Sequence, residues 1–369
     1  MKPPTPRPPP HFVERGRALG SRGLLPLSIA MGRGVGGGAL LSRRRALWLL
    51  AASTATGFGL AACQPARLVR RDPSRRLVLR INLYGSAAYA PLLVMRERRM
   101  LEEALPGLAV EWKAIPSADD VNEAVRAGGL DLGVGPPTAF LLAREAGLPV
   151  RLLCGVSALP CAVVGRAGLR SLGGLKKSDK VAVPDQSSLE AAVLQLAALR
   201  ELGDPAALDG NLLERAHVEA LPALTLGKDV AAHVAVTPFL ELELEGTGPE
   251  RLVDSRDLFG GLPTAALVFG LPSLRERAAP LLAAFTETLA EAARRTTADP
   301  LATARLLSEA DDLRAPPERI GEILARSGWQ PGPKLTGVVR IAELWWRTDR
   351  LRQPPATWAE LAFDGVPGE

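Results

Sequence analysis

The chain has 369 residues, of which 47% are hydrophobic and 23% are charged, and its formal net charge is +5. This length suits two or three domains, and the hydrophobic content excludes a chain that is disordered throughout. The positive charge is concentrated before residue 80, where arginine is frequent and acidic residues are rare. Because no basic stretch interleaved with aromatic residues follows, the composition does not indicate a protein that binds nucleic acid.

The N-terminal segment has the composition of a leader. Residues 1–41 are rich in proline and then in glycine, and they are predicted to be disordered or an over-extended start. Residues 42–62 begin with arginines and continue as an apolar run that becomes rich in small residues, which is typical of a secretory signal peptide. The alternative is an uncleaved anchor helix, although the run would barely span an apolar core of about 30 Å.

The end of this run, "LAAC" at residues 60–63, resembles the lipobox of bacterial lipoproteins. The resemblance implies that Cys63 becomes the first residue of the mature protein and carries the lipid that anchors it to a membrane. The arginine pair at 43–44 also resembles a twin-arginine export motif, with Ala46 where that motif prefers phenylalanine. Both export routes therefore stay open. Residues 63–76 are predicted to be a tether.

After the tether, short apolar strands alternate with helices of about ten to fifteen residues, which is the pattern of parallel βαβ units. Ser117 and Asp120 form a capping pattern at the start of one helix. In this first part we expect strands at 77–84, 108–116, 130–135 and 149–157, and helices at 91–105, 117–128 and 137–147.

The same alternation repeats after residue 160. Ser187 and Glu190 are predicted to form a capping box at the start of the helix in this part. After about residue 272 the pattern is purely helical up to residue 350. In this second part we expect strands at 161–165, 180–184, 216–221, 233–238 and 263–270, and a helix at 187–202.

Four segments in this order resemble the substrate-binding proteins of ABC importers, in the group that binds nitrate, sulfonates, taurine and thiamine-precursor pyrimidines. The first resembles that family's opening strand, ligand loop and helix, and the second its small-Gly-x-Leu-Asp phrase ahead of a glycine-containing loop. The third resembles the start of the second lobe, and the fourth the return to the first lobe. They are "RINLYGSAAYAPLLVMRERRMLEE", "AVRAGGLDLGVGPPTAFLLAREAGLPVRLL", "LRSLGGLKKSDKVAVPDQSSLE", and "HVAVTPFLELELEGTG" with "RLVDSRDLFGGLPTAALVFG".

The resemblance implies the α/β type II periplasmic-binding-protein fold, in which two lobes joined by crossover strands hold a ligand in the cleft between them. Lobe I would comprise 77–158 and 263–369 with the helical tail, and lobe II would comprise 159–262. The expected function is that of an exported, lipid-anchored, monomeric protein, on the outer face of the cytoplasmic membrane or in the periplasm. It would capture a small polar or anionic organic ligand and deliver it to an ABC transporter permease, with no cofactor.

Tyr84 and Tyr89 are the only tyrosines in the chain, and they flank "GSAA" directly after the first strand. A tyrosine offers a flat apolar face and a hydroxyl group, which suit a small polar ligand. The alternative is that one of them packs under the following helix. The other candidate ligand-binding residues lie in loops near predicted strand ends: Ser86, Pro137, Thr138, Ser157, Asp185, Gln186, Ser187, Ser188, Thr237 and Phe239.

The loop "PDQSS" at 184–188 precedes a helix, whose free N–H groups and positive dipole end can bind an anion. The alternative is that its serines only cap the helix. Asp185 departs from the small residues that are usual here in the family. Its charge puts a plain sulfonate or nitrate in doubt and favours a zwitterion or an amine-bearing heterocycle.

Cys154 and Cys161 lie seven residues apart on adjoining strands. Export would allow a disulfide between them, and two buried free thiols are the alternative. The three histidines show no metal-ligand spacing, so no metal is expected. Two other functions are alternatives: a sensor or interaction lipoprotein that kept the fold without transport, and an enzyme on the same fold. The chain shows no nucleophile elbow, P-loop or Ser/His/Asp set that would indicate an enzyme.

Overall fold

The computed structural model describes residues 70–71, 77–115, 117–227, 229–310, 315–353 and 357–369. All of them belong to one structural unit, Cys63–Glu369. The predicted start at 1–41, the signal segment at 42–62, Cys63 and most of the tether lie outside the described residues. Within the described part of the chain, no helix is both long enough and apolar enough to cross a membrane.

The first sheet has the strand order β1-β2-β4-β11-β5-β12, and β3 pairs with β2. Strands β2, β3 and β4 run parallel, whereas β11 runs antiparallel to its neighbours β4 and β5. Nearly every residue of β4 and β5 is buried, which is why these segments read as continuous apolar runs. The strands are β1 Arg70–Arg71, β2 Leu77–Leu83, β3 Leu108–Ala114, β4 Leu132–Gly135, β5 Arg151–Ala158, β11 Thr264–Gly270 and β12 Gln330–Pro331.

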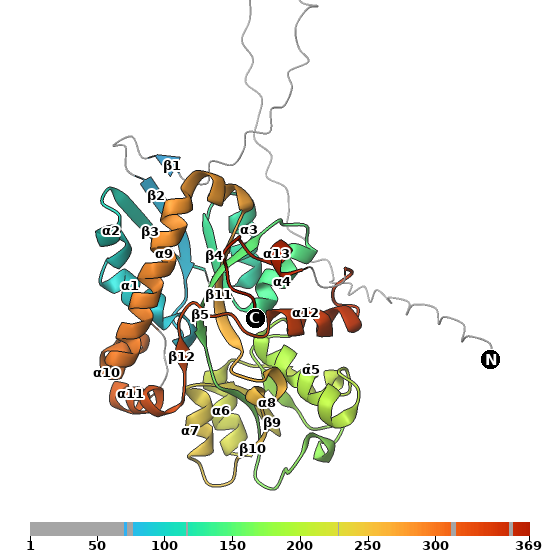
Figure 1. The fold of residues 1–369 in the computed structure, drawn as a ribbon. Coiled ribbons are helices and arrows are strands. Elements are labelled where there is room, and N and C mark those ends of the chain that lie inside the picture. Colours follow the sequence, from blue (N-terminus) through green and yellow to red (C-terminus); the bar gives the residue numbers. More distant parts are fainter. Residues whose placement is uncertain (1–69, 72–76, 116, 228, 311–314, 354–356) are drawn as a thin grey trace, which may run out of the picture. The chain divides into compact units, whose positions relative to one another are not determined.

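Helices cover this sheet (Figure 1). Where one helix is expected over 91–105, the structure has two, because Arg99 adopts a left-handed conformation with φ 49°. The break gives a second helix whose first two residues, Met100 and Leu101, are buried. The helices are α1 Ala90–Glu97, α2 Met100–Ala104, α3 Ala118–Arg126, α4 Pro137–Glu145, α9 Pro272–Ala298, α10 Pro300–Ala310 and α11 Pro317–Arg326, with a 3-10 turn at Ala87–Tyr89.

Asn82 joins two strands of the first sheet close to the carboxyl end of β2. The backbones of β2 and β4 are paired at Ile81 and Leu132. One residue further on, the Asn82 amide takes over, because its Nδ2 donates to the Val134 carbonyl at 2.8 Å and its Oδ1 accepts from the Val134 N–H at 2.7 Å. The buried amide thus replaces a pair of backbone hydrogen bonds. This bridging role of Asn82 was not predicted from the sequence.

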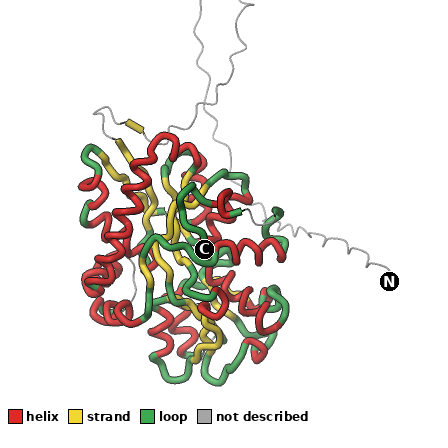
Figure 2. Tube along the Cα trace, viewed as in Figure 1, coloured by secondary structure: helices red, strands yellow, loops and turns green. Residues whose placement is uncertain are grey.

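The second sheet has the order β10-β6-β9-β7-β8, in which β7 is parallel to both β8 and β9. Figure 2 shows helices flanking the strands of both sheets. The strands are β6 Cys161–Gly165, β7 Val181–Val183, β8 Leu212–Glu214, β9 Ala232–Val236 and β10 Glu250–Asp254. The helices are α5 Leu189–Leu202, α6 His217–Thr225, α7 Phe239–Leu244 and α8 Ser255–Phe259, with 3-10 turns at Leu172–Gly174 and Asp209–Asn211.

One predicted strand is wrong. Ala216 is the N-cap of α6 and residues 217–221 form its first part, because Ala220, Ala223 and Leu224 are buried at helical spacing. The strand of this region is β8, which ends two residues before Ala216. Strands β8 and β10 were not predicted because they are short and only partly buried.

The segment after α11 is not purely helical, because β12 pairs with β5 of the first sheet. Two further helices follow, α12 Val338–Arg347 and α13 Trp358–Leu361. Helix α12 lies beside α5 (Figure 1), and Trp345 Nε1 donates to Gln195 Oε1 of that helix at 3.1 Å. Just beyond α12, Arg350 donates to the Gln186 carbonyl at 3.2 Å. Segment 330–350 is therefore attached to both halves of the unit.

The chain passes from the first sheet to the second between β5 and β6, and it returns between β10 and β11. Strands of the first sheet lie within 70–158 and 264–331, and those of the second within 161–254. The lobe boundaries at 158–159 and 262–263 remain a prediction.

Candidate ligand-binding site

A cavity of about 350 Å³ lies where strand ends of the two sheets face each other. Its wall is formed by the residues that follow the carboxyl ends of β2 and β4 in one sheet and of β7, β8 and β9 in the other. This is where open α/β sheets bind ligands. Its volume lies within the usual range of small-molecule sites.

Tyr84 and Tyr89 form an edge-to-face pair in this wall, with ring centroids 6.1 Å apart. The Tyr89 hydroxyl donates to the Val134 carbonyl at 3.4 Å, so the strand pair bridged by Asn82 also positions this ring. Burial, with a smaller effect of Tyr84, raises the pKa of Tyr89, so its hydroxyl stays protonated. The two rings give the cavity an aromatic side.

The loop before α5 satisfies much of its own hydrogen bonding. Asp185 Oδ1 accepts from the Ser187 N–H at 2.7 Å and from the Ser187 hydroxyl at 2.6 Å. The N-cap of α5 is Ser188, whose Oγ accepts from the Ala191 N–H at 3.1 Å. The predicted capping box of Ser187 and Glu190 is therefore wrong: the cap lies one residue later, and Ala191 has no side chain that could complete a box. Because Asp185 occupies the Ser187 N–H, that N–H is not open to an anionic ligand.

His217 and Glu190 also line the cavity, and neither of them is among the ligand residues predicted from the sequence. His217 is the first residue of α6, and its ring stacks on Phe239 with centroids 5.1 Å apart. Its Nε2 lies 3.4 Å from Glu190 Oε1. His217 was not predicted as a ligand residue because residues 216–221 were expected to form a strand. In the structure His217 instead begins the helix that follows β8. No cluster of potential metal ligands is found among the described residues.

Eight of the predicted ligand residues line the cavity: Tyr84, Ser86, Tyr89, Asp185, Ser187, Ser188, Thr237 and Phe239. Pro137, Thr138, Ser157 and Gln186 are not among the described lining residues. Thr138 and Ser157 are fully buried, and the Ser157 hydroxyl donates to the Ala88 carbonyl at 2.7 Å, which supports the tyrosine loop from behind. Gln186 is exposed, and its backbone N–H donates to Glu214.

The predicted cysteine pair consists of two free, buried thiols in the structure. Cys154 belongs to the core that covers one face of the first sheet, whereas Cys161 belongs to a different core cluster. Burial raises the pKa of both thiols. Of the two alternatives, the structure has the free thiols.

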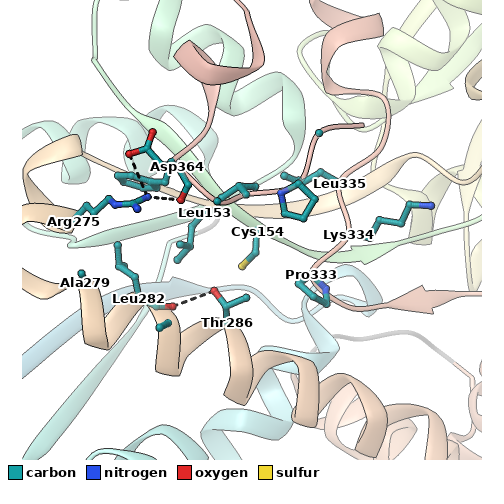
Figure 3. A pocket seen from close by; sticks show the side chains of 16 residues that line it. Leu153, Cys154, Arg275, Ala279, Leu282, Thr286, Pro333, Lys334, Leu335 and Asp364 are labelled. Carbon is teal, nitrogen blue, oxygen red and sulfur yellow. Dashed lines mark hydrogen bonds and ion pairs between the residues drawn. The ribbon is translucent and has the colours of Figure 1, made fainter.

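A larger cavity of about 590 Å³ lies beside β5, α9 and the C-terminal residues. Figure 3 shows Cys154, Leu282 and Thr286 in its wall, and Arg275 bonded to Asp364 at its edge. It contains none of the predicted ligand-binding residues and lies away from the strand ends named above. The smaller cavity is therefore the better candidate site.

The charge of the candidate site is negative. Asp185 and Glu190 both line it, and none of its described lining residues is a lysine or an arginine. With two tyrosines, a histidine and a phenylalanine in the same wall, the site can stack a flat group and accept hydrogen bonds from it.

No protein-family model matches the chain. No curated protein matches it either. Solved structures do: the aliphatic sulphonate binding protein SsuA from Escherichia coli is 20% identical, with a TM-score of 0.63 over 79% of this chain and 94% of that one. SsuA from Xanthomonas axonopodis pv. citri, bound to MOPS, is 21% identical, with a TM-score of 0.61 over 78% and 98%. The nitrate-binding protein NrtA from Synechocystis PCC 6803 is 12% identical, with a TM-score of 0.51 over 66% and 69%.

These similarities confirm the predicted fold class. The chain has the type II periplasmic-binding-protein fold, with two α/β halves and a largely helical C-terminal region. Its structural neighbours are binding proteins that include those of sulfonate and of nitrate.

Proposed function

We propose that this protein binds a small polar organic solute outside the cytoplasm and delivers it to the permease of an ABC importer. The observation that carries the proposal is the cavity at the facing strand ends, which gathers eight residues predicted from the sequence. The structural neighbours named above bind sulfonate or nitrate, which supports a binding role rather than an enzymatic one. Lipid anchoring through Cys63 belongs to the same proposal.

Ligand capture in this fold requires the two halves to close on the solute. We propose that they bend at the two crossovers, near Val156–Cys161 and Pro263–Phe269, because these segments join the sheets. Hinge closure of this kind buries the ligand and creates the shape that a permease recognises. Small-angle scattering should therefore give a smaller radius of gyration once a ligand is bound.

Thermal-shift measurements on the full chain test the binding role, with a panel of sulfonates, taurine, nitrate, pyrimidines and aromatic acids. A ligand at a hundred times its dissociation constant should add about 2.7 kcal/mol to the free energy of unfolding. Tyr84→Ala should abolish the shift, because Tyr84 is a half-exposed ring in the cavity wall. Trp346→Ala is the matched control, since this ring on α12 is equally exposed and does not line the cavity.

A panel without any stabilising member would contradict the proposal. So would a ligand whose thermal shift survives Tyr84→Ala and disappears with Trp346→Ala.

A further inference from the structure

Four titratable side chains form a continuous series that begins at the cavity wall and ends in the protein core. Glu190 and His217 are 13% and 15% exposed, whereas His233 and Glu243 are fully buried. His217 Nε2 lies 3.4 Å from Glu190 Oε1, and His217 Nδ1 lies 2.8 Å from His233 Nε2. His233 Nδ1 in turn contacts Glu243 Oε1. We call these four residues the Glu–His–His–Glu chain.

Counting protons fixes the net charge of this chain. Each of its three contacts joins two atoms that share one proton, so three protons satisfy all of them. If both carboxylates are ionised and both imidazoles are neutral, the four groups carry a net charge of −2 and only two protons. One of the three contacts then has no proton, so that two lone pairs face each other. The third proton brings the net charge to −1. That single charge can lie at Glu190, at Glu243, or at both ends with an imidazolium between them.

Burial favours placing the charge at Glu190. Glu243 has no exposed surface, and its second oxygen has no hydrogen-bond partner among the described residues. Desolvation therefore raises the pKa of Glu243 to about 8 and holds the pKa of His233 well below its usual range. Burial also acts to raise the pKa of Glu190, but the hydrogen bond and the electrostatic interaction with His217, with smaller hydrogen bonds to the backbone and to Ser188, outweigh it, so that pKa is lowered. Glu243 is thus the protonated end and Glu190 the ionised one.

Other charged groups around the chain already have partners. Arg251 and Arg256 both pair with Asp254. On α7, Glu241 accepts from the Thr237 hydroxyl at 2.9 Å, and on the facing loop Asp185 is held by Ser187. On β6, burial keeps the Cys161 thiol protonated by raising its pKa. With no described lysine or arginine in the cavity wall, the charge of Glu190 is left to face a ligand.

We propose that the Glu–His–His–Glu chain acts as one proton-sharing unit that keeps a single negative charge on Glu190, and that Glu190 recognises a ligand nitrogen carrying a proton. This inference rests on the proposed function, since it requires a solute in the cavity. The ligand class is a small flat cation, such as an amidinium or a protonated heterocyclic amine. The rings of Tyr84, Tyr89 and Phe239 suit such a group, because aromatic faces attract cations.

The proton positions can be read from the ligand-free protein. The whole sequence contains three histidines, so ¹⁵N-histidine labelling of the full chain gives few signals, which His217→Gln and His233→Gln assign. At pH 7 we expect both rings to be neutral and to carry their proton on Nε2, because Glu190 accepts from one ring and protonated Glu243 donates to the other. Glu243→Gln should keep these tautomers, since its amide also donates. A proton on Nδ1, or a doubly protonated ring, would overturn the proposal.

Benzamidine and benzoate test the recognition role, because they are planar, similar in shape and opposite in charge. At pH 7 benzamidine should raise the Tm of the wild type and of Glu219→Gln, which alters an exposed carboxylate on α6 outside the cavity wall. Glu190→Gln should weaken benzamidine binding at least tenfold, about 1.4 kcal/mol. Benzoate should not stabilise the wild type.

The other possible outcomes reject either the recognition role of Glu190 or the proposed function. Equal binding of benzoate and benzamidine, or benzamidine binding that survives Glu190→Gln, rejects recognition by Glu190. If nitrate or taurine stabilises the protein and benzamidine does not, the binding function stands and the inference fails. If the tautomers are as expected and no compound of either panel binds, Glu190 is rejected as the recognition group together with the proposed function.

Discussion

Replacing Glu243 by glutamine should change how stability depends on pH. The folded protein holds the Glu243 proton up to about pH 8, whereas the ordinary value for an exposed glutamate is 4.5. A carboxyl whose pKa is raised by folding contributes stability that is fully present below the unfolded pKa and is lost as pH rises through the folded pKa. The difference of 3.5 pKa units (8 − 4.5) corresponds to about 5 kcal/mol.

Glutamine isolates this effect because it keeps the size of glutamate, stays neutral at every pH and can donate to His233 in place of the carboxyl proton. The assay is urea unfolding of both proteins at each pH from 5 to 9. The wild type should lose free energy of unfolding relative to Glu243→Gln by about 1.4 kcal/mol per pH unit up to pH 8. The total is a large fraction of the 5–15 kcal/mol that is typical of folded proteins.

Taking the difference between the two proteins removes the titration of groups that are common to both. Glu219→Gln, an exposed carboxylate on α6, is the control and should give a flat difference. A flat difference for Glu243→Gln between pH 5 and 9 would refute the assignment of a proton to Glu243. An ionised Glu243 at the buried end of the Glu–His–His–Glu chain would give such a flat difference, because the carboxylate would then be deprotonated in both the folded and the unfolded protein above about pH 5.

Three further substitutions test features of the fold and of the leader. Asn82→Leu should lower the free energy of unfolding by about 2–4 kcal/mol, because it leaves the buried N–H of Val134 without its partner and the Val134 C=O with only the long bond from the Tyr89 hydroxyl. Urea unfolding measures this loss, and a loss below about 1 kcal/mol would contradict the bridging role. Gly155→Ala should destabilise by about 1–3 kcal/mol, since its Cβ would lie 2.1 Å from the Lys334 carbonyl oxygen. The control Ala279→Ser, at an exposed position of α9, should leave the free energy of unfolding nearly unchanged. Cys63→Ala should abolish labelling of the protein by a fatty-acid analogue, and equal labelling of both forms would exclude the lipid anchor.

Local patterns predicted much of the site, because the cavity is built from loops that follow strands. Tyr84, Tyr89, Asp185 and Phe239 could be selected for that reason alone, and all four line the cavity. The cap of α5 was displaced by one residue because "SS" offers two serines in equivalent chemical positions, and only the backbone geometry makes Ser188 the cap.

The rest of the site depends on contacts between distant segments. His217 was hidden by a short sequence that alternates like a strand and becomes helical once Ala220, Ala223 and Leu224 find a core. The pairing of His233 with Glu243 requires α7 to fold back against β9. No residue spacing in the sequence predicts this contact, because it is created by tertiary packing.

The attachment of segment 330–350 to both sheets bears on how long a ligand stays bound. The hydrogen bond from Trp345 to Gln195 can lengthen by only a few tenths of an ångström before it is lost, and losing it costs about 1 kcal/mol. Movement that carries α5 away from α12 must break this bond and the one from Arg350 to Gln186. Both losses raise the barrier to opening, so we expect α12 and the residues just after it to slow ligand dissociation without contacting the ligand.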